Sequence, residues 1–257
     1  MLLLPSQANL MKMRLEKLVT YLLLAEIGCP VFKSAIIFPT EQINQDTINQ
    51  LRAYFHTGQV TVRYQYIRPC HSPIQGGNRY PLSLEALSLL QNEDTVLWLL
   101  EPINRLENEY GINLYFHSNE CKIELVGRGF DVSDLNRGHI SPHQTITTEL
   151  PIRKGWYNEW WKFLRYSFVS QEEYQNSQAI RIQKLKKMGL NASYDIFCDC
   201  YRPLPYQMLE QLLYYIVLIH NTITEEDFCV SCSISNGSFV FWDIQTPNGK
   251  KIIYGVS

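Results

Sequence analysis

Hydrophobic residues recur along the chain at two spacings, one typical of helices and one typical of strands. Helical spacing predicts helices over residues 8–26, 40–55, 83–90 and 205–220, and a helical pattern over residues 155–189. Runs rich in β-branched and aromatic residues predict strands, which in chain order are 31–38, 60–67, 95–103, 111–118, 121–127, 227–235, 238–245 and 250–256. This mixture predicts an α+β protein with antiparallel sheets.

Local signals suggest where these elements begin and turn. Thr40 and Ser83 are candidate helix N-caps, and the dipeptides at 236–237 and 248–249 are both Asn-Gly, a typical hairpin turn. The pattern changes after a polar loop and a short helix that follow the strand at 60–67. We therefore expect an N-terminal α+β lobe over residues 1–92 and a C-terminal α+β lobe over residues 93–257.

The overall charge limits the classes of partner. The 257 residues include 23 basic and 25 acidic side chains and carry a formal net charge of -2, so no field of the whole molecule steers it onto nucleic acid or an anionic membrane. The apolar start, MLLLP, is too short for a signal sequence or a membrane span. We expect a cytoplasmic protein that binds neither nucleic acid nor membrane.

Seven cysteines are an odd number, which favours reduced thiols over a disulfide framework. Cys198 and Cys200, followed by Cys229 and Cys232, are the candidate ligands of a structural zinc ion. Against zinc, a single residue separates the first pair, and a strand over the second pair would direct Cys229 and Cys232 to opposite faces. A zinc-bearing structural protein stays as an alternative.

The segment VTVRYQYIRPCHSPIQGGNRYPLS carries candidate anion-binding groups. Arginine side chains bind phosphate or carboxylate oxygens with two hydrogen bonds, and glycine lets backbone N–H groups approach an anion closely. The candidates in this segment are Arg63 on the strand, and Arg68, Gly76, Gly77 and Arg79 in the predicted loop after it. A surface hairpin is the alternative interpretation.

Two further segments place acidic residues beside strands. The loop GRGFDVSDLNRG follows the strand at 121–127, and a charged ligand there would be bound by Glu124, Asp131 or Asp134, Arg128 and Arg137. Without a ligand, Asp134 would serve as a helix cap in a polar turn. Asp243 lies inside the aromatic strand SFVFWDIQ, where a buried carboxylate needs a partner or a cation, unless it faces solvent at a sheet edge.

Taken in order, these pieces resemble an ATP-grasp nucleotide-binding domain, of the type at the N-terminus of pyruvate phosphate dikinase and phosphoenolpyruvate synthase. The matching pieces, in chain order, are VFKSAIIF, VTVRYQY, VLWLLEP, IELVGRGFDVSDLNRGHISPH and FWDIQTPNGKKIIYGV. The resemblance implies two α+β lobes with antiparallel sheets that enclose a nucleotide cleft. It implies ATP and Mg²⁺ as cofactors, and a small-molecule acceptor such as a carboxylate.

The resemblance also implies roles for particular residues. Lys33 and Arg63, with Arg68, would neutralise phosphates, and the loop at Gly76 and Gly77 would cover them. The backbone from Glu101 to Ile103 would contact adenine. Magnesium would be held by Asp243 and Glu124. The acceptor would face three residues, Arg128, Arg137 and His143.

Some features depart from the family pattern. Gln245 stands where the family usually has a second metal-binding glutamate, and the usual Gln-x-Arg ending is absent. The resemblance therefore implies either an ATP-dependent ligase or phosphotransferase, with a partner protein supplying a missing domain, or a nucleotide-binding regulatory module without turnover.

Overall fold

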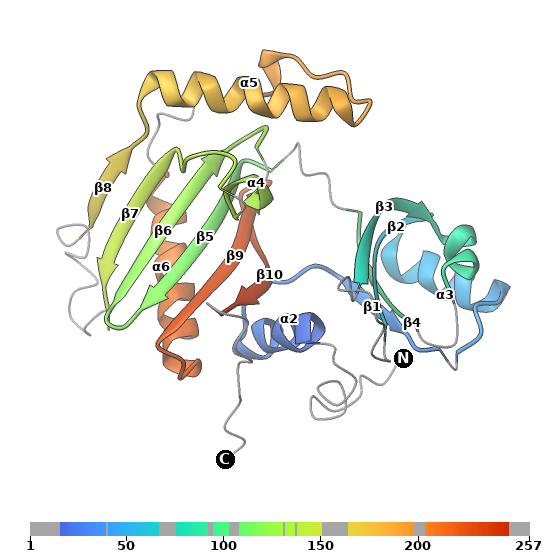
Figure 1. Ribbon diagram of the computed structural model, residues 1–257. Coiled ribbons are helices and arrows are strands. Elements are labelled where there is room, and N and C mark those ends of the chain that lie inside the picture. Colours follow the sequence, from blue (N-terminus) through green and yellow to red (C-terminus); the bar gives the residue numbers. More distant parts are fainter. Residues whose placement is uncertain are drawn as a thin grey trace. The chain divides into compact units, whose positions relative to one another are not determined.

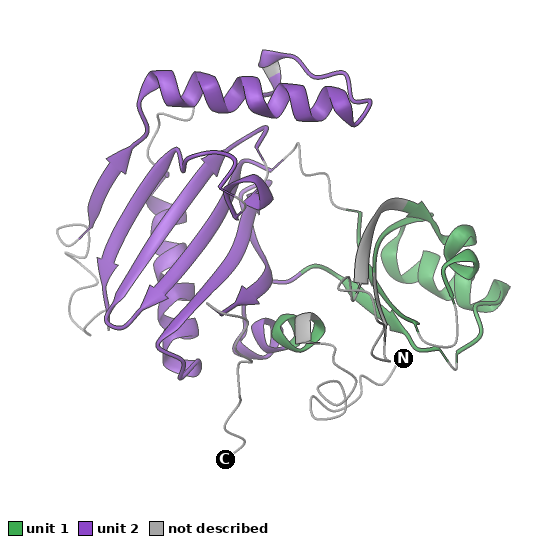
Figure 2. Ribbon diagram, in the orientation of Figure 1, with its two compact units in different colours: residues 1–22, 32–103 green, residues 23–31, 104–257 purple. Residues whose placement is uncertain are grey.

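The computed structural model divides the chain into two compact units (Figure 2). Unit 1 comprises residues 1–22 and 32–103, and unit 2 comprises residues 23–31 and 104–257. The structure describes these stretches of the chain: 16–39, 41–66, 76–91, 95–102, 108–130, 132–136, 138–150, 164–197 and 204–246. The α+β class with antiparallel sheets is confirmed.

Unit 1 contains a four-stranded antiparallel sheet, covered on one face by a helix (Figure 1). Its strands in spatial order are β1 (Ser34–Ile37), β4 (Thr95–Leu100), β2 (Gln59–Tyr66) and β3 (Gly76–Ser83). Helix α3 (Gln45–Phe55) and the 3-10 helix η1 (Leu84–Leu89) pack with the sheet through a buried cluster that includes Leu51, Val62 and Leu99. The expected division after residue 92 falls before β4, and the structure places β4 in unit 1.

Two local expectations in unit 1 need correction. Helix α3 begins later than expected, because the side chain of Asn44 accepts a hydrogen bond from the N–H of Thr47 and caps the helix there. Thr40 lies outside the described residues. Gly76 and Gly77 do not form a loop, since they pair with Gln65 and Tyr64 in the ladder between β3 and β2.

Unit 2 contains a six-stranded antiparallel sheet with a helix on one face and a second helix across one end (Figure 1). Its strands in spatial order are β10 (Ser238–Gln245), β9 (Asp227–Ser235), β5 (Tyr110–His117), β6 (Glu120–Gly127), β7 (Gln144–Glu149) and β8 (Arg165–Phe168). The turn between β9 and β10 is at Asn236 and Gly237, which both have positive φ, as a type I′ hairpin requires. That predicted turn is confirmed, and the one at 248–249 lies outside the described residues.

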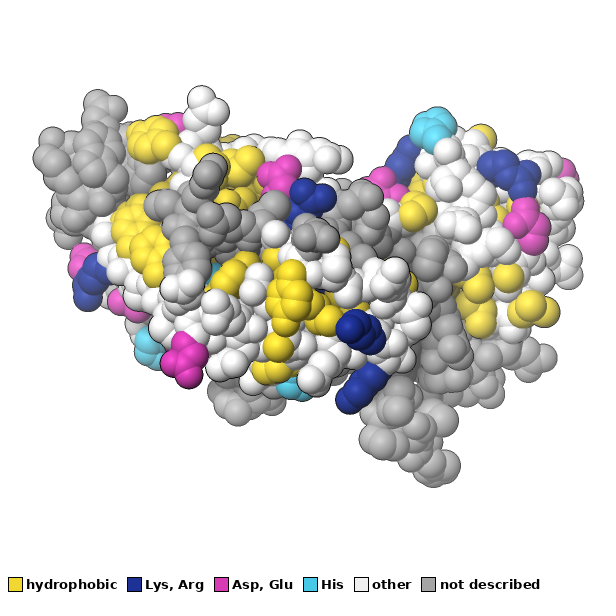
Figure 3. All heavy atoms as spheres, turned by 90° about the horizontal axis from the view of Figure 1, so that it is seen from above, with side chains coloured by type: hydrophobic (Ala, Val, Ile, Leu, Met, Phe, Trp, Pro, Cys, Tyr) yellow, Lys and Arg dark blue, Asp and Glu magenta, His cyan; other side chains and the backbone are white. Residues whose placement is uncertain are grey.

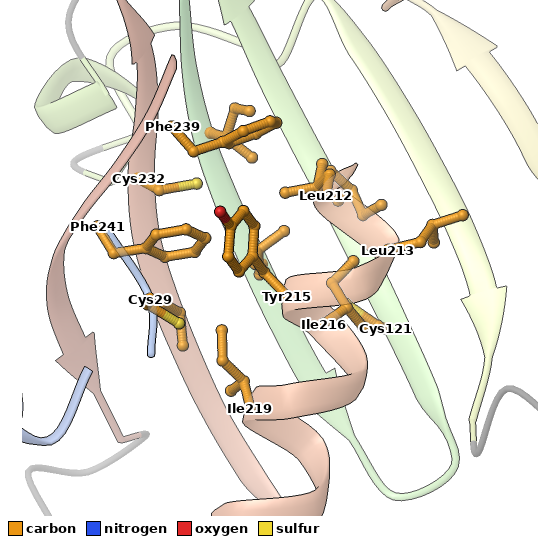
Figure 4. Packing of buried hydrophobic residues seen from close by; sticks show 14 of the residues in the cluster. Cys29, Cys121, Leu212, Leu213, Tyr215, Ile216, Ile219, Cys232, Phe239 and Phe241 are labelled. Atoms are coloured by element: carbon orange, nitrogen blue, oxygen red, sulfur yellow. The ribbon is translucent and has the colours of Figure 1, made fainter. Parts of the chain in front are cut away.

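Helix α6 (Tyr206–Thr222) covers one face of this sheet and builds the main core. Its apolar side chains, with the end of helix α2 (Glu16–Ile27), meet the inward side chains of the strands (Figure 4). Cys29, Cys121 and Cys232 are buried in this core as free thiols. Burial raises the pKa of the Cys29 thiol to about 12 and that of the Cys232 thiol well above its usual value, so these cysteines act as packing residues.

Two elements lie where the sequence indicated something else. The helical pattern over residues 155–189 becomes strand β8, and only later helix α5 (Gln171–Lys187), which begins with a capping box at Ser170 and Glu173. Strand β7 was not expected at all. The basic residues from Arg181 to Lys187 belong to α5, and Arg181 is buried.

Among the described residues on the face seen from above, neither positive nor negative side chains dominate. There the described Lys and Arg side chains are scattered among polar and acidic ones (Figure 3). Within the described part of the chain, no helix combines the length and the apolar character needed to cross a membrane.

Candidate functional site

In unit 1, the face of the sheet turned away from α3 carries Arg63 and Trp98. Val60 and Val62 of β2 pack in the cluster beneath α3, so Arg63, one position further on, points to the opposite face. There its guanidinium lies over the ring of Trp98, 4.9 Å from the ring centre, in a cation–π contact. Tyr21 of α2 packs edge-on against the same ring, so Arg63 is held by aromatic packing.

Lys33 lies on the other face of this sheet. Its ammonium group is 4.6 Å from the ring centre of Tyr54, which belongs to α3. The expectation that Lys33 and Arg63 together neutralise phosphates is therefore wrong in its geometry, because the strand directs the two side chains to opposite sides of the sheet.

Glu101 fastens the end of β4 to the start of β1. Its N–H donates to the carbonyl of Lys33 at 3.0 Å, and its carboxylate Oε1 accepts from the N–H of Lys33 at 3.1 Å. Because Pro102 has no N–H, neither of these two residues offers a backbone donor to adenine. Ile103, like Arg68, lies outside the described residues.

In unit 2, the sheet face opposite α6 carries two transverse rows of mostly polar side chains, which we call the polar face. The strand registers align the first row as Asp243, Ser231, Asn113, Glu124 and Thr145. They align the second row as Gln245, Cys229, Tyr115, Lys122 and Thr147. Each row runs across β10, β9, β5, β6 and β7.

A β-bulge in β10 places Asp243 on the polar face. Phe239 and Phe241 both pack in the core beneath α6, and simple alternation would send Asp243 there too. The register shifts between Phe241 and Asp243, so that Asp243 pairs with Ser231 and Ile244 turns into the core instead. Asp243 is 7% exposed, and its Oδ2 accepts a hydrogen bond of 2.7 Å from Nε2 of Gln245.

Glu124 and Asp243 do not share a metal ion. They stand in the same row, but β9 and β5 separate their strands, so three strand spacings place their Cα atoms about 14 Å apart. Mg²⁺ binds its oxygen ligands at about 2.1 Å. The two side chains are therefore too far apart to reach one ion together. Glu124 instead pairs with Lys122 at 2.5 Å. Among the described residues, no group of three or more His, Cys, Asp or Glu side chains is arranged to hold a metal.

The cysteines of the proposed zinc set lie on opposite sides of β9. Cys232 points into the core (Figure 4), whereas Cys229 stands on the polar face. Burial first, and then the charges of Asp243 and Glu124, raise the pKa of the Cys229 thiol to about 12. Because the two side chains leave β9 on opposite faces, Cys229 and Cys232 cannot bind the same zinc ion. Cys198 and Cys200 lie outside the described residues.

A hollow of about 480 Å³ lies at one end of β5, β9 and β10, where residues from both faces of the sheet meet. Its lining residues are Tyr115, Phe116, His117, Asp227, Phe228, Cys229, Gln245 and Thr246. This volume is within the range of pockets that hold small molecules. Nδ1 of His117 contacts Oδ1 of Asp227 beside this hollow, and the two residues stand directly opposite each other in the ladder of β5 and β9.

His143 and Arg128 were expected to face an acceptor together with Arg137. His143 is 2% exposed and packs between the rings of Phe130 and Tyr174, and its Nδ1 accepts from the N–H of Gly127 at 3.1 Å. Burial lowers its pKa to about 4. A neutral, enclosed histidine belongs to the packing of unit 2 rather than to a substrate-binding surface. Arg128 is exposed in the turn after β6, and Arg137 and Asp131 lie outside the described residues.

A buried ion pair ties α5 to the short helix α4 (Val132–Asn136). Nη1 of Arg181 lies 2.9 Å from Oδ2 of Asp134, and the side chains are 5% and 4% exposed. Lys184 also contacts Asp134, and Nε of Arg181 donates to the carbonyl of Gly129 at 3.0 Å. Asp134 is therefore the anchor of α4 and not a helix cap.

The residues that the sequence did not single out include Asn113, Ser231, Asn136 and Trp98. A signal for part of this set was present, since Cys229, Ser231 and Ser233 alternate with apolar residues along the predicted strand at 227–235. Such alternation indicates a polar face on one side of a strand. Nothing local marks Asn136 or Trp98.

No protein-family model and no curated protein sequence matches the chain. Solved structures of similar fold include D-alanine-D-alanine ligase from Bacillus anthracis complexed with ATP, at TM-score 0.45 and 9% identity over 95% of this chain and 58% of that one. A second is the D-alanine-D-alanine ligase from Coxiella burnetii, with a TM-score of 0.38 and 13% identity over 91% of this chain and 48% of that one. A third is a RiPP-associated ATP-grasp ligase from Chryseobacterium gregarium in complex with ADP and a leader and core peptide, with a TM-score of 0.38 and 8% identity over 93% of this chain and 53% of that one. The chain spans about half the length of these structures.

The chain is thus an α+β protein with two antiparallel sheets, and unit 2 has one sheet face under a helix and one lined by polar side chains. None of the three similar structures is a pyruvate phosphate dikinase or a phosphoenolpyruvate synthase, so that narrower resemblance stays a prediction.

Proposed function

We propose that the chain is an ATP-grasp-like protein that binds ATP with Mg²⁺ and acts as an ATP-dependent ligase or phosphotransferase on a small carboxylate or similar acceptor. The observation that carries this proposal is the polar face of unit 2, where a bulge places Asp243 beside Ser231 on an otherwise neutral part of the first row. A cytoplasmic location, and a partner protein that supplies a further domain, belong to the same proposal.

The residues fit a magnesium site with a single protein carboxylate. Mg²⁺ usually binds one or two carboxylates and completes its shell with water and phosphate oxygens. Asp243 supplies one carboxylate, and the charge of such an ion would neutralise phosphate oxygens. Glu124 is too distant to join it and pairs with Lys122 instead.

In unit 1, Arg63 supplies the positive charge. Its guanidinium is fixed by Trp98, so little side-chain entropy would be lost when it binds a phosphate oxygen. In phosphoryl transfer, catalysis comes mostly from positioning and charge neutralisation. Arg63 would contribute a fixed positive charge in unit 1, a role that requires no proton exchange.

The direct test is calorimetric titration of MgATP into the protein and into Arg63→Met. Loss of a hydrogen-bonded charge predicts a dissociation constant roughly 10- to 100-fold higher. Arg52→Met is the matched control, because Arg52 lies on α3 and pairs with Glu85 at the surface. No binding to the unsubstituted protein at millimolar nucleotide would refute the proposal.

A nucleotide-binding module without turnover is the second candidate. The observation that favours it is Gln245, an amide where the family usually has a second metal-binding glutamate, whose Nε2 donates a hydrogen bond of 2.7 Å to Oδ2 of Asp243. Binding of MgATP without release of ADP in the presence of any tested carboxylate or amine would support this candidate over the ligase.

A further inference from the structure

The side-chain amide of Asn113 is held in one orientation at the centre of the polar face. The residue is fully buried. Its Nδ2 donates to Oδ1 of Asn136 and, at 3.3 Å, to the hydroxyl of Tyr115. Its Oδ1 accepts a hydrogen bond of 2.9 Å from the hydroxyl of Ser231. Because the amide nitrogen can only donate, its partners direct the carbonyl oxygen toward Ser231.

This orientation decides how Ser231 can bind a ligand. A serine hydroxyl has one proton, and Ser231 donates it to Asn113, so only acceptor lone pairs are left for another partner. Ser231 stands directly opposite Asp243 in the ladder of β9 and β10, with Cβ atoms about 5 Å apart. Ser231 and Asp243 therefore offer oxygen acceptors side by side, the type of ligand that hard cations prefer.

Asn136 is itself fixed in place through α4. Asp134, two residues earlier, is bound by Arg181 and Lys184 of α5. The helix also lies close against β5, because a Cβ atom at Gly111 would be 3.2 Å from Cβ and 3.3 Å from the backbone N of Val132, so a larger residue at position 111 would push against α4.

We propose that Ser231 is a second ligand of the divalent cation bound by Asp243, and that Asn136 is a positioning residue that acts through Asn113. Asn136 holds the amide of Asn113 in the orientation that takes up the proton of the Ser231 hydroxyl. The oxygen of Ser231 then has a lone pair free to coordinate the ion. This inference rests on the cation site of the proposed function and names the second oxygen of that site.

The test is titration with Mn²⁺, followed by the electron paramagnetic resonance signal of the free ion, with and without a non-hydrolysable ATP analogue. Four variants are compared with the unsubstituted protein: Asp243→Asn, Ser231→Ala, Asn136→Ala and Thr145→Val. The last is the matched control, because Thr145 carries a hydroxyl in the same row on the far side of Glu124. Thermal unfolding midpoints establish that the variants are folded.

Asp243→Asn should abolish Mn²⁺ binding, and Thr145→Val should leave it unchanged. Ser231→Ala and Asn136→Ala should each raise the dissociation constant roughly three- to tenfold, the range of one lost hydrogen-bonding partner. The double variant Ser231→Ala/Asn136→Ala should bind as Ser231→Ala does, because Asn136 acts only through the hydroxyl that has been removed. A merely structural effect of Asn136 would instead add to that of Ser231.

The outcomes separate this inference from the proposed function. If the unsubstituted protein binds no Mn²⁺, or if Asp243→Asn binds it normally, the cation site fails and the inference fails with it. If Asp243→Asn loses the ion while Ser231→Ala retains full affinity, the proposed cation site stands and Ser231 is not a ligand. If the double variant shows additive losses, the positioning role of Asn136 is overturned.

Discussion

The ion pair between Arg181 and Asp134 provides the sharpest test of how unit 2 is held together. Both side chains are almost fully buried, at 5% and 4% exposed, and they join α5 to α4 across 47 positions of sequence. We consider the change Arg181→Met, which keeps the length and apolar stem of the side chain but removes its charge and its hydrogen bonds.

The expected loss follows from what is left behind. Removing one partner of a buried pair typically costs 3–5 kcal/mol, because an uncompensated charge stays in the interior. Here Lys184 still contacts Asp134, while the carbonyl of Gly129 loses its donor. We therefore expect the free energy of unfolding to fall by about 3 kcal/mol, the lower end of that range. Arg181→Met/Asp134→Leu should recover most of this loss, because no buried charge is left unpaired.

Urea unfolding followed by circular dichroism measures the loss in the free energy of unfolding. Hydrogen exchange, measured separately on peptides from each unit, shows which part of the chain is destabilised. Protection should fall on α4, α5 and the end of β6, and not in unit 1. The matched control is Arg165→Met, which removes a pair with Glu149 whose side chains are 73% and 61% exposed; it should cost less than about 1 kcal/mol. A loss below about 1 kcal/mol in Arg181→Met, or a double variant less stable than the single one, would refute the reasoning.

Two further predictions concern titratable groups. Burial lowers the pKa of His143 to about 4 in the folded protein, whereas the unfolded chain takes up this proton below about pH 6.5. The free energy of unfolding should therefore fall as the pH is lowered from 6.5 to 4, by about 3 kcal/mol in all. Unfolding free energies at pH 7 and pH 5 should show a smaller drop in His143→Phe than in the unsubstituted protein, and equal drops would contradict the prediction. Alkylation of Cys229 near pH 8 should be slow, since burial and then Asp243 and Glu124 raise its pKa to about 12. Asp243→Asn should accelerate it, as measured by mass spectrometry of the labelled peptide, and an unchanged rate would show that the two groups do not interact.

Where elements have a strong local period, the sequence was sufficient to predict them. The apolar stripe from Leu209 to Ile219 identified α6, and the alternation along the strand at 227–235 correctly separated Cys229 from Cys232. Strand β3 was missed because Gly76, Gly77 and Pro81 have low strand propensity, and its pairing with β2 overrides that preference. Tertiary pairing likewise decides the edge strand β8.

The candidate site was predictable only in part, for a topological reason. Arg63 and Asp243 could be named from their strands, because a charged residue among apolar ones is visible locally. The separation of Glu124 from Asp243 depends instead on β5 lying beside β9, a neighbour relation between strands more than 100 residues apart in sequence. The contact of Asn136 with Asn113 and that of Arg181 with Asp134 have no local signal either, since their partners come from distant elements.

The bulge at Trp242 connects the architecture of unit 2 with the proposed chemistry. A regular strand through Phe239 and Phe241 would bury the carboxylate of Asp243 beneath α6, where desolvation without a partner is costly, and would turn Ile244 outward. The extra residue of the bulge switches the faces to which the following side chains point, so Asp243 faces outward and Ile244 faces the core. The cost is the loss of regular pairing in the ladder at that position. For packing alone, an apolar residue at position 243 without a bulge would serve equally well. Because the strand instead keeps a carboxylate and bends to present it beside Ser231, this place on the polar face is where we expect ligand binding to be concentrated.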